Sequence, residues 1–474
     1  MTGALARLYR LCDEDGGREV ACGRGWSLTR AELLQRVEAA AAACAASGIG
    51  PQSRVGLTVT DELDNLIASL ALLGLGCWHV ILASHDTPEL RREIATRAEL
   101  DTVVVGGRDP TTAGLRFVDW QMQPGANTSR LASVEGGTLL RTSGTTGTIN
   151  LVPLDSADIA LQAERHPGYA GSRLFRPASI EHNNSKRHRL YCLAMGGTNV
   201  FRPAGPYDLA AFCLEARVSA VDITLMHAAD LVAAAGTIGV RTVDFIVSGS
   251  EMPYPLRRRF EDNVSRRLHV RYGSTECGTI SIADPGEHDE AESVGRPVPG
   301  LRLEIVDERG RPLPDGETGH IRLQVPGMTA GYFNDPEQTS RRFRDGWFWP
   351  GDMGMLRPDG SLIVKGRADD MMNLNGINIF PIEIESVLER HPAVAAAAAA
   401  ATKSSVHGDI PVAVVELRAG HTVEVRELMD FARQQLALRA PRRIVIVASL
   451  PRNAQGKLLR RAVPELVNNA RTGK

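Results

Sequence analysis

The run T-S-G-T-T-G at residues 142–147 has the residue types that bind phosphate. Backbone N–H groups of a glycine-rich turn point at a close-lying anion, and Ser and Thr hydroxyls add further donors. The run follows Leu139 and Leu140, as a loop after a buried strand would. An ordinary surface turn is the alternative interpretation. The P-loop spacing G-x-x-x-x-G-K-[ST] does not occur in the chain, so a phosphate loop here is of another kind.

Four further short segments place a charged residue beside or close to glycine. "RYGSTECG" (271–278) offers two hydroxyls for phosphate and Glu276 as a ligand for Mg²⁺. "WPGDMG" (349–354) and "VKGRADD" (364–370) put Asp352 and Arg367 directly after a glycine, where either charge can bind ribose hydroxyls. "LPRNAQGKLLRR" (450–461) puts Lys457 after a glycine near the C-terminus. Taken singly, each segment is also compatible with an ordinary turn.

Lysine is rare in this chain, which makes Lys457 informative. Lysine occurs only at 186, 365, 403, 457 and 474, so 49 of the 54 basic residues are arginine. In a chain that uses arginine almost everywhere, a lysine kept inside a motif indicates that a compact primary ammonium is needed there.

Composition narrows the class of protein. A length of 474 residues predicts roughly two to four domains, and 43% apolar with 23% charged residues is typical of a globular protein. With 54 basic against 56 acidic side chains, nothing in the bulk charge points to nucleic acid or an anionic membrane. Small, locally recognised ligands are favoured.

Cysteine and histidine spacing argue against metal or disulfide scaffolds. The seven cysteines form no C-x-x-C pair and the twelve histidines no H-E-x-x-H pair, so we expect reduced thiols and a cytoplasmic protein. The N-terminus turns acidic before a signal-peptide core develops. Residues 66–83 carry no formal charge, but Gly74, Gly76 and His79 interrupt them, and we expect a helix followed by a strand there, with no membrane span.

The elements that must position these residues alternate between strand and helix. Strands are predicted at 54–59, 78–83 and 102–106, with helices at 61–73 and 88–98 between them. Further strands at 223–226 and 244–249 enclose a helical segment at 228–235. Short β-branched runs alternating with helices imply βαβ units and a mostly parallel sheet, so the fold class is α/β.

The chain changes character towards its C-terminus. Residues 300–325 are predicted to form two antiparallel strands around a Gly/Pro/Asp turn, and 354–367 a second hairpin. The last hundred or so residues have helices of their own at 381–390 and 424–438, enough for a separate small domain. The alanine run 395–401 has helical propensity, but its periodicity does not decide between helix and strand.

The order and spacing of the five motifs resemble the adenylate-forming superfamily of acyl-CoA synthetases, peptide-synthetase adenylation domains and luciferases. The resemblance runs from "WSLTRAELLQRV" (26–37) to Lys457. It implies ATP- and Mg²⁺-dependent activation of a carboxylic acid to an acyl adenylate with pyrophosphate release, followed by acyl transfer. It also implies a core of mixed sheets flanked by helices with a β-barrel-like subdomain at 1–368, and a small mobile α+β domain at 369–474 that carries Lys457.

The resemblance also assigns roles to residues at matching positions. Glu276 would hold Mg²⁺, Asp352 and Arg367 the ribose, and Lys457 would bridge the ribose, the α-phosphate and the acid's carboxylate. Asp369 matches the hinge about which the C-terminal domain rotates between the two half-reactions. The full nucleotide-binding set implied is Thr142, Ser143, Gly144, Thr145, Thr146, Gly147, Gly249, Ser250, Glu251, Tyr272, Gly273, Ser274, Thr275, Asp352, Arg367 and Lys457.

The acid pocket is expected around "EHNNSKRHRLYCLAMGGTNVF" (181–201), which resembles the superfamily's fourth core motif. His182 would border the substrate carboxylate. Amino-acid-activating members carry Asp where this chain has Asn183, so α-amino acids are disfavoured, and aliphatic and aromatic acids both remain possible. The pocket residues implied are His182, Asn183, Ser248, Gly249, Tyr272, Gly273 and Ser274.

Three positions depart from the superfamily's pattern. The phosphate loop usually continues with Pro-Lys-Gly, where this chain has Ile149, Asn150 and Leu151. Pro350 stands where Thr is common, and Asn373 where Lys is common. We expect altered ATP affinity or a slower first step, with Lys457 still placed at the reacting centre.

The acceptor has three candidates. "NLNGINIFPIEIE" (373–385) resembles the CoA-ligase form of the segment after the hinge, which favours CoA. Amide formation with a free amine ranks second and loading of a separate carrier protein third. A non-catalytic ATP-binding homologue, motivated by Asn150, is a further alternative.

Overall fold

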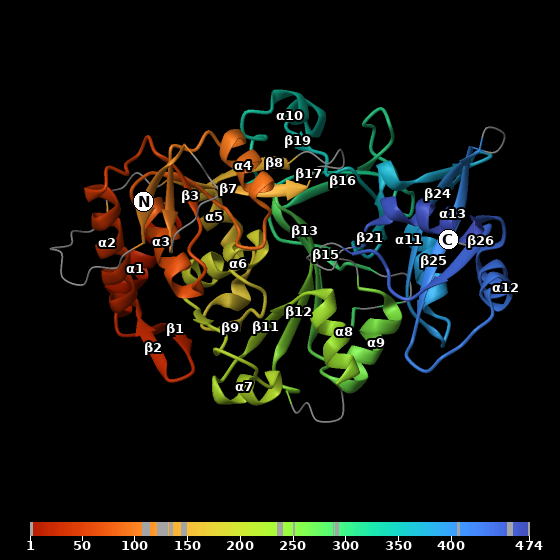
Figure 1. Ribbon diagram of the computed structural model, residues 1–474, viewed down its shortest axis with the longest axis horizontal. Coiled ribbons are helices and arrows are strands. Elements are labelled where there is room, and N and C mark those ends of the chain that lie inside the picture. The colour runs from red at the N-terminus through yellow and green to blue at the C-terminus, as the bar shows by residue number, and fades with distance from the viewer. Residues whose placement is uncertain are drawn as a thin grey trace.

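The computed structural model describes residues 3–106, 114–120, 131, 136–143, 149–234, 240–249, 252–287, 289, 293–404, 408–452 and 458–472. A large body runs from red to green on the left of Figure 1, and a smaller C-terminal unit, in blue, lies on its right. Among the described residues, no helix combines the length and apolar character needed to cross a bilayer.

Two sheets form the large body. The first has the strand order β15-β14-β13-β12-β11-β9-β10-β1-β2, and the strands from β13 to β1 are parallel to their neighbours. Parallel strands of this kind need crossover helices and are buried on both faces. The strands are β1 (Glu19–Gly23), β2 (Trp26–Thr29), β9 (Arg173–Phe175), β10 (Thr198–Val200), β11 (Ala220–Ile223), β12 (Asp244–Ser248), β13 (Leu268–Ser274), β14 (Gly278–Ala283) and β15 (Arg296–Pro297).

The second sheet has the order β6-β5-β3-β4-β7-β8 and is parallel except for the antiparallel pair β7–β8. Fully buried strands such as β5, with the sequence T-V-V-V, explain why these segments were recognisable as β-branched runs. The strands are β3 (Arg54–Leu57), β4 (Trp78–Ile81), β5 (Thr102–Val105), β6 (Arg116–Asp119), β7 (Gly137–Ser143) and β8 (Ile149–Asp155).

Helices join the two sheets into one core. A single cluster of buried side chains contains strand residues of both sheets together with residues of α1, α2, α3, α5 and α6. Short polar residues begin several of the helices: Asp61 accepts from two backbone N–H groups of α3, and Thr29 forms a capping box with Glu32. The helices of the body are α1 (Ala4–Asp15), α2 (Arg30–Ala46), α3 (Glu62–Gly74), α4 (Pro88–Arg97), α5 (Ser156–Ala163), α6 (Asn183–Ala194), α7 (Leu209–Glu215), α8 (Leu225–Ala233) and α9 (Tyr254–Asn263).

The predicted strand at 223–226 is wrong. Strand β11 ends at Ile223, and Thr224 then caps α8 by accepting from the N–H of His227, three residues on. The apolar pair Leu225 and Met226 therefore opens a helix. An apolar run of four residues fits either element, and the Thr224 cap decides it locally.

An antiparallel sheet follows the body, and it contains both hairpins predicted for 300–325 and 354–367. Its order is β18-β19-β17-β20-β21, with β16 beside β17, and the pairs β16–β17 and β20–β21 are antiparallel. The elements are β16 (Arg302–Val306), β17 (Gly319–Gln324), α10 (Pro336–Arg342), β18 (Phe343–Arg344), β19 (Trp347–Phe348), β20 (Asp352–Leu356) and β21 (Leu362–Arg367).

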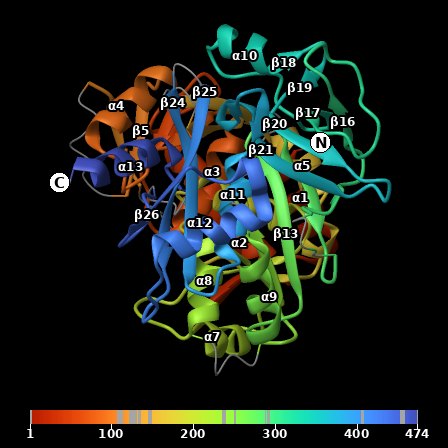
Figure 2. The same cartoon turned by 90° about the vertical axis from the view of Figure 1, so that its right-hand side faces the viewer.

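The C-terminal unit has a sheet of its own, which faces the viewer in Figure 2. The order is β23-β22-β25-β24 with β26 beside β25, and two clusters of buried side chains, drawn from residues 372–467, fill it. The alanine run lies in strand β24, which pairs with β25 at ten register positions, six of them in the run. The elements are β22 (Met372–Leu374), β23 (Ile377–Ile379), α11 (Pro381–Glu389), β24 (Val394–Ser404), β25 (Gly408–Leu417), α12 (Val425–Leu436), β26 (Arg443–Val447) and α13 (Val463–Thr472).

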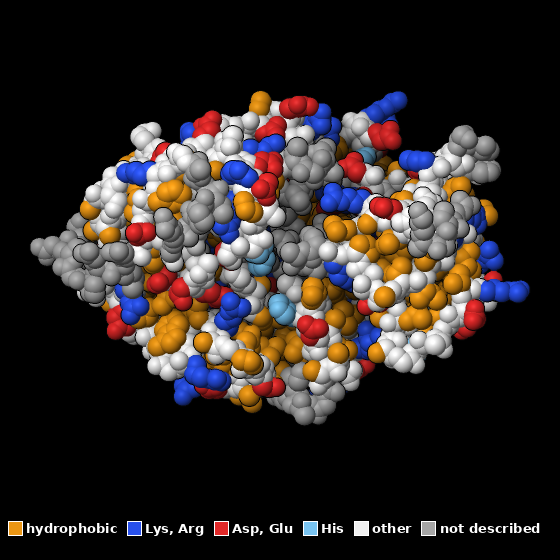
Figure 3. Space-filling view, viewed as in Figure 1, with side chains coloured by type: hydrophobic (Ala, Val, Ile, Leu, Met, Phe, Trp, Pro, Cys, Tyr) orange, Lys and Arg blue, Asp and Glu red, His pale blue; other side chains and the backbone are white. Residues whose placement is uncertain are grey.

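The α/β fold predicted from the sequence is confirmed, with several mixed sheets in a large body and a small C-terminal unit. On the face seen in Figure 3, basic and acidic side chains are interspersed, and hydrophobic side chains gather on the lower part of the body and on the C-terminal unit. All seven cysteines are free thiols, and six of them are buried.

Candidate active site

Helix α6 connects three segments that carry predicted site residues. The amide of Asn183 donates to the carbonyl oxygen of Arg141 in β7, the strand that leads into T-S-G-T-T-G. Asn184 Nδ2 donates to Ser248 Oγ at the end of β12, over 3.1 Å. Arg187 Nη1 donates to the carbonyl oxygen of Thr275, after β13, over 2.9 Å. Segments up to 134 residues apart in the sequence (141 to 275) therefore converge on the first two turns of one helix.

The side chains of this helix are buried from Ser185 to Ala194, including the charged run at 186–189. A run such as S-K-R-H-R would ordinarily face solvent, since charged residues are seldom fully buried without partners. Its burial here means that each charge must find its partner inside the protein.

The phosphate-loop motif lies at the end of a hairpin. Thr142 and Ser143 are the last residues of β7, and Thr142 lies opposite Asn150 in β8. Asn150 is only 8% exposed and lines a hollow together with Arg97 and Phe333. Gly144, Thr145, Thr146 and Gly147 lie outside the described residues.

The turn after β13 presents Ser274, Thr275 and Glu276, and two buried arginines hold it. Arg187 contacts the carbonyl oxygens of Ser274 and Thr275, and Arg165 contacts that of Cys277. A side chain at position 273 would lie 2.4 Å from the carbonyl oxygen of Gly278, so the pairing of β13 with β14 requires Gly273. Arg165 and Arg187 were not predicted, because their partners lie 112 and 88 residues away and no motif marks them.

Glu276 is oriented by a tyrosine. The hydroxyl of Tyr332 donates to Glu276 Oε1 over 2.8 Å, and burial raises the pKa of Tyr332, so the phenol keeps its proton. Among the described residues no group of three or more His, Cys, Asp or Glu side chains could hold a metal by itself. Mg²⁺ is usually held by one or two carboxylates together with phosphate oxygens, so a single oriented Glu276 fits such a site.

Asp352 and Arg367 lie opposite each other across the hairpin β20–β21. Arg367 Nη1 donates to Asp352 Oδ1 over 3.2 Å and to the carbonyl oxygen of Pro350 over 2.6 Å. Tyr272, from β13, donates its hydroxyl to the other oxygen of Asp352. Burial and the neighbouring Asp352 raise the pKa of Tyr272 well above its ordinary value, so the donor keeps its proton at physiological pH.

The backbone beside Asp352 adopts a conformation that residues with a side chain rarely take. Gly351 has a φ of +84°, and a Cβ there would lie 2.0 Å from a guanidinium nitrogen of Arg342. Arg342 is therefore a further cation at this site. The Nη2 atoms of Arg342 and Arg367 lie 3.8 and 4.0 Å, respectively, from Asp369 Oδ2, and the Asp369 side chain is 58% exposed.

His182 precedes α6 and is partly buried. Its ring centroid lies 5.1 Å from that of His85. Burial, followed by the charge of His85, lowers the pKa of His182 below its ordinary value. His182 is therefore a neutral imidazole at neutral pH, able to donate one hydrogen bond and accept another.

Some predicted residues are placed only indirectly. Gly249 is exposed, has a φ of +89° and would accept a Cβ without contact within 4 Å, but Ser250 and Glu251 lie outside the described residues. Lys457 also lies outside them, in the segment 453–457. The base of that segment is fixed by an antiparallel bridge between Arg452 and Leu458.

Comparison with known proteins identifies the family. The model of the AMP-binding enzyme family matches residues 9–333, and that of the AMP-binding enzyme C-terminal domain matches 383–457. A 2-succinylbenzoate–CoA ligase of Geobacillus kaustophilus (strain HTA426) is 34% identical over 225 residues, which are 47% of this chain and 46% of that relative. A fatty acid–[acyl-carrier-protein] ligase, ScoC, of Streptomyces coeruleorubidus is 36% identical over 196 residues, 40% of this chain and 38% of that protein.

The match therefore spans less than half the length of each of these relatives. Over the whole chain, the amide bond synthetase McbA from Marinactinospora thermotolerans has the same fold, with a TM-score of 0.87 at 22% identity, covering 98% of this chain and 99% of that one. Because the first family model alone covers more than half of the residues, the superfamily resemblance inferred from the five motifs is confirmed: the chain belongs to the AMP-binding enzyme family.

Proposed function

We propose that this protein is an AMP-forming ligase that activates a carboxylic acid with ATP and passes the acyl group to a thiol, that of CoA. In the first step a carboxylate oxygen of the acid forms a bond to the α-phosphorus of ATP, the bond from that phosphorus to the bridging oxygen breaks, and pyrophosphate leaves. In the second step the thiol sulfur forms a bond to the acyl carbon, AMP leaves, and the thiol loses its proton.

The observation that carries this proposal is the hydrogen bond from the Tyr272 hydroxyl to the Asp352 carboxylate. It joins residues 80 apart and brings the Y-G-S-T-E motif beside the Gly-Asp and Gly-Arg motifs. Asp352 and Arg367 offer a carboxylate and a guanidinium side by side, which suits two ribose hydroxyls. The turn Ser274–Glu276, directly after Tyr272, then supplies hydroxyls for phosphate and a carboxylate for Mg²⁺.

The roles proposed for Glu276 and His182 follow from their positions, and that of Lys457 from the family resemblance. Mg²⁺, held by Glu276 and phosphate oxygens, would neutralise charge on the departing pyrophosphate. His182, neutral and half-buried, would donate to the acid's carboxylate from the start of α6. Lys457 would meet the carboxylate and α-phosphate, where negative charge concentrates as the new bond forms.

We also propose that the chain divides after residue 368 into the core and a lid that rotates about Asp369. Support comes from the separate sheet and separate buried clusters of residues 372–467, and from the exposure of Asp369 between Arg342 and Arg367. Two successive reactions with different second substrates need two arrangements around one site, which a rotating lid provides.

CoA ranks first as the acceptor because of the segment after the hinge. Residues 372–379 form the hairpin β22–β23, and Asn373 holds its turn by accepting from the N–H of Gly376 over 3.0 Å. The CoA-ligase name of the Geobacillus relative supports this choice, and the carrier-protein ligase ScoC supports loading of a separate carrier. Amide formation stays the second candidate, favoured by the replacement of the phosphate-loop lysine by Asn150 and by the shared fold of an amide bond synthetase.

The test is a panel of carboxylic acids assayed for pyrophosphate release in the presence of ATP and Mg²⁺, each with CoA, with free amino acids or amines, and with neither. The proposal predicts acid-dependent release, stimulated by CoA and accompanied by an acyl-CoA product. Stimulation by an amine with an amide product would reassign the acceptor. ATP binding without pyrophosphate release for any acid would contradict the proposal and favour a non-catalytic nucleotide-binding protein.

A further inference from the structure

A charged network lies under the proposed acid pocket, at the carboxyl ends of four adjacent parallel strands. Arg176 follows β9, Asp222 lies in β11, Ser248 ends β12 and Arg271 lies in β13. The register places Ser248 opposite Arg271 and Val221, the residue before Asp222, opposite Phe175, the residue before Arg176. In open α/β sheets, ligands bind outside this end of the strands.

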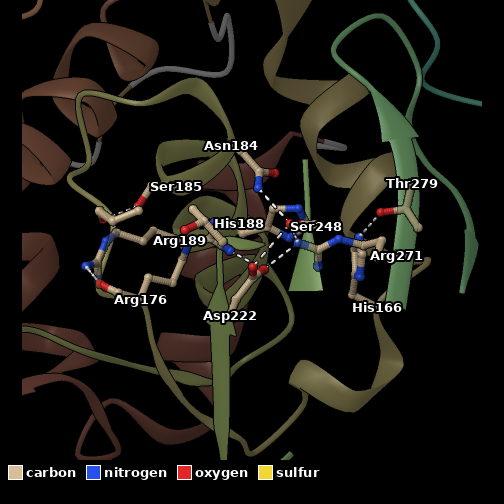
Figure 4. A network of polar contacts seen from close by, with 12 residues as sticks. His166, Arg176, Asn184, Ser185, His188, Arg189, Asp222, Ser248, Arg271 and Thr279 are labelled. Atoms are coloured by element: carbon tan, nitrogen blue, oxygen red, sulfur yellow. Dashed lines mark hydrogen bonds and ion pairs between the residues drawn. The ribbon is translucent and has the colours of Figure 1, made fainter. Parts of the chain in front are cut away.

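Every member of the network is hydrogen-bonded to another. Asp222 Oδ2 accepts from a guanidinium nitrogen of Arg176 and from one of Arg271. Ser248 Oγ accepts from Arg271 Nη2 over 3.0 Å and from Asn184 Nδ2 over 3.1 Å. Figure 4 shows the Asp222 carboxylate pointing toward Ser248 and Arg271, with Asn184 reaching the network from α6.

The three charged members carry one excess positive charge. Arg176, Asp222 and Arg271 are 2%, 1% and 6% exposed, so two guanidinium groups share a single buried carboxylate. His188 adds no charge at neutral pH, because burial and the nearby arginines hold its pKa well below the ordinary value. Buried charge is costly unless it is paired, and an apolar cluster in this place would be at least as stable.

Asn184 and Ser248 are the two least buried members of the network. Asn184 is half-buried and Ser248 is 9% exposed, and Gly249, which follows Ser248, is exposed and has no atom within 4 Å of where a Cβ would stand. Among the described residues, the Asn184 side chain makes one hydrogen bond, to Ser248, and so keeps a second N–H for a ligand. Behind these two polar side chains stands the excess positive charge.

We propose that the acid activated by this protein carries a second carboxylate, which Asn184 and Ser248 bind and which balances the excess charge of the group Arg176–Asp222–Arg271. This inference rests on the proposed function and names the substrate class of the same site. An N–H donor on the pocket side and positive charge behind it both favour an anionic group, whereas an alkyl or phenyl group placed there would leave the N–H unpaired.

The test compares dicarboxylic acids of three to six carbons with monocarboxylic acids of the same chain length and with the monomethyl ester of each diacid. The measured quantity is kcat/KM for acid-dependent pyrophosphate release. We expect at least one diacid to exceed its monoacid and its ester by roughly tenfold or more, as for a charge-assisted hydrogen bond.

Two variants then test whether Asn184 and Ser248 cause the preference for diacids over monoacids. Asn184→Asp keeps the shape of the side chain but places a negative charge in the pocket, and should lower the diacid-to-monoacid ratio by at least roughly tenfold. Ser248→Ala removes the hydroxyl that joins Asn184 to Arg271 and should lower the same ratio by a smaller factor. Thermal unfolding of both variants checks that the fold is retained, and the ratio is measured within each variant.

The outcomes separate this inference from the proposed function. Pyrophosphate release with monoacids or esters preferred at every length would overturn the second-carboxylate proposal and leave acid activation standing, as would a ratio unchanged in Asn184→Asp. If no acid of any kind caused pyrophosphate release, both proposals would be overturned.

Discussion

At the scale of single residues, the site depends on charges that are oriented by tyrosines. Tyr272 holds Asp352 and Tyr332 holds Glu276, and burial raises the pKa of both phenols, so each stays a donor across the physiological range. The two carboxylates proposed for ribose and Mg²⁺ are therefore fixed before any ligand binds, and binding needs little rearrangement of the protein.

Replacing Tyr272 by Phe tests this orientation. Removing one hydrogen bond to a charged group costs about 1.5–3 kcal/mol, so the KM for ATP should rise roughly tenfold or more. Tyr207→Phe is the matched control, because Tyr207 lies in the same body and its ring packs against Phe175 and Phe212. Steady-state kinetics measures both, and equal KM values in the two variants would contradict the assigned role of Tyr272.

Replacing Lys457 by Ala tests the residue proposed for the reacting centre. Loss of a donor that meets charge in the transition state lowers rates by ~10²- to 10³-fold, so acyl-adenylate formation should be lost or nearly lost while the protein stays folded. Lys403→Ala, at an 86% exposed side chain of the same domain, is the control and should keep full activity. First-step turnover retained in Lys457→Ala, measured as pyrophosphate release, would remove Lys457 from the mechanism.

Among the elements, helix α6 matters most, because it contacts three segments of the site and is buried along most of its length. Lys186 on this helix is fully buried beside His79 of β4, with Nζ and Nε2 2.8 Å apart. Burial lowers the pKa of Lys186 to about 7 and holds that of His79 well below its ordinary value. Both groups are then largely neutral in the folded protein above neutral pH.

This pair makes stability depend on pH. The pKa of Lys186 is lower in the folded protein than in the unfolded chain. Between about pH 7 and the pKa of an unfolded lysine, the unfolded chain therefore binds more protons, and the free energy of unfolding rises with pH. Relative to Lys186→Met, the free energy of unfolding of the wild type should increase by about 2 kcal/mol from pH 7 to pH 9. His79 titrates below this window. Denaturant unfolding at three pH values measures the difference, and a constant difference would show that Lys186 is charged in the folded protein.

The sequence predicted elements well where local chemistry decides them. Capped helices such as α3 and buried β-branched strands such as β5 lie where their patterns place them. The alanine run became strand β24 because β25 and the hydrophobic cluster around it outweigh the helical propensity of alanine. Helical propensity can be read from the local sequence, whereas the strand pairing that overrides it depends on residues farther along the chain.

The same limit applies to the site. Motif residues such as Asp352 and Arg367 could be predicted because glycines beside them mark unusual backbone. Tyr332, Arg165 and Arg187, which hold the motif residues in place, act across 56 to 112 residues and carry no local pattern. The charged run of α6 resembles a solvent-facing segment, and only the packing of two sheets around it shows that it is buried.

At the scale of the whole molecule, the proposed first step requires the C-terminal unit to bring Lys457 to the core. Arg460, just after the segment 453–457, donates two hydrogen bonds to Glu385 of α11, over 2.8 and 2.5 Å, and the Glu385 side chain is 3% exposed. This ion pair joins the end of the Lys457 segment to the first helix after the proposed hinge. Along the chain, both of its residues follow the proposed hinge at Asp369, whereas Asp352 and Arg367 precede it.

Arg460→Met should therefore impair the first step more than nucleotide binding. The Arg460 side chain is 28% exposed and Glu385 only 3%, so removing Arg460 leaves a buried carboxylate without its charged partner, at a cost of about 1–3 kcal/mol. The C-terminal unit should therefore unfold at lower denaturant concentration, and pyrophosphate release should fall by roughly tenfold. The neighbouring exposed Arg461, changed to Met, is the control. Calorimetry measures the ATP affinity of the variant. A loss of affinity as large as the loss of rate would contradict the prediction that the first step is impaired more than nucleotide binding.

In the proposed first step, an oxygen of the acid attacks the innermost phosphorus of ATP within the site formed by Asp352, Arg367 and the turn Ser274–Glu276. An acid labelled with ¹⁸O in its carboxylate measures this directly, with the product AMP analysed by mass spectrometry after acyl transfer. We expect each AMP to gain one labelled oxygen from the acid and pyrophosphate to gain none. Unlabelled AMP, or label found instead in inorganic phosphate with ADP as the product, would contradict this step.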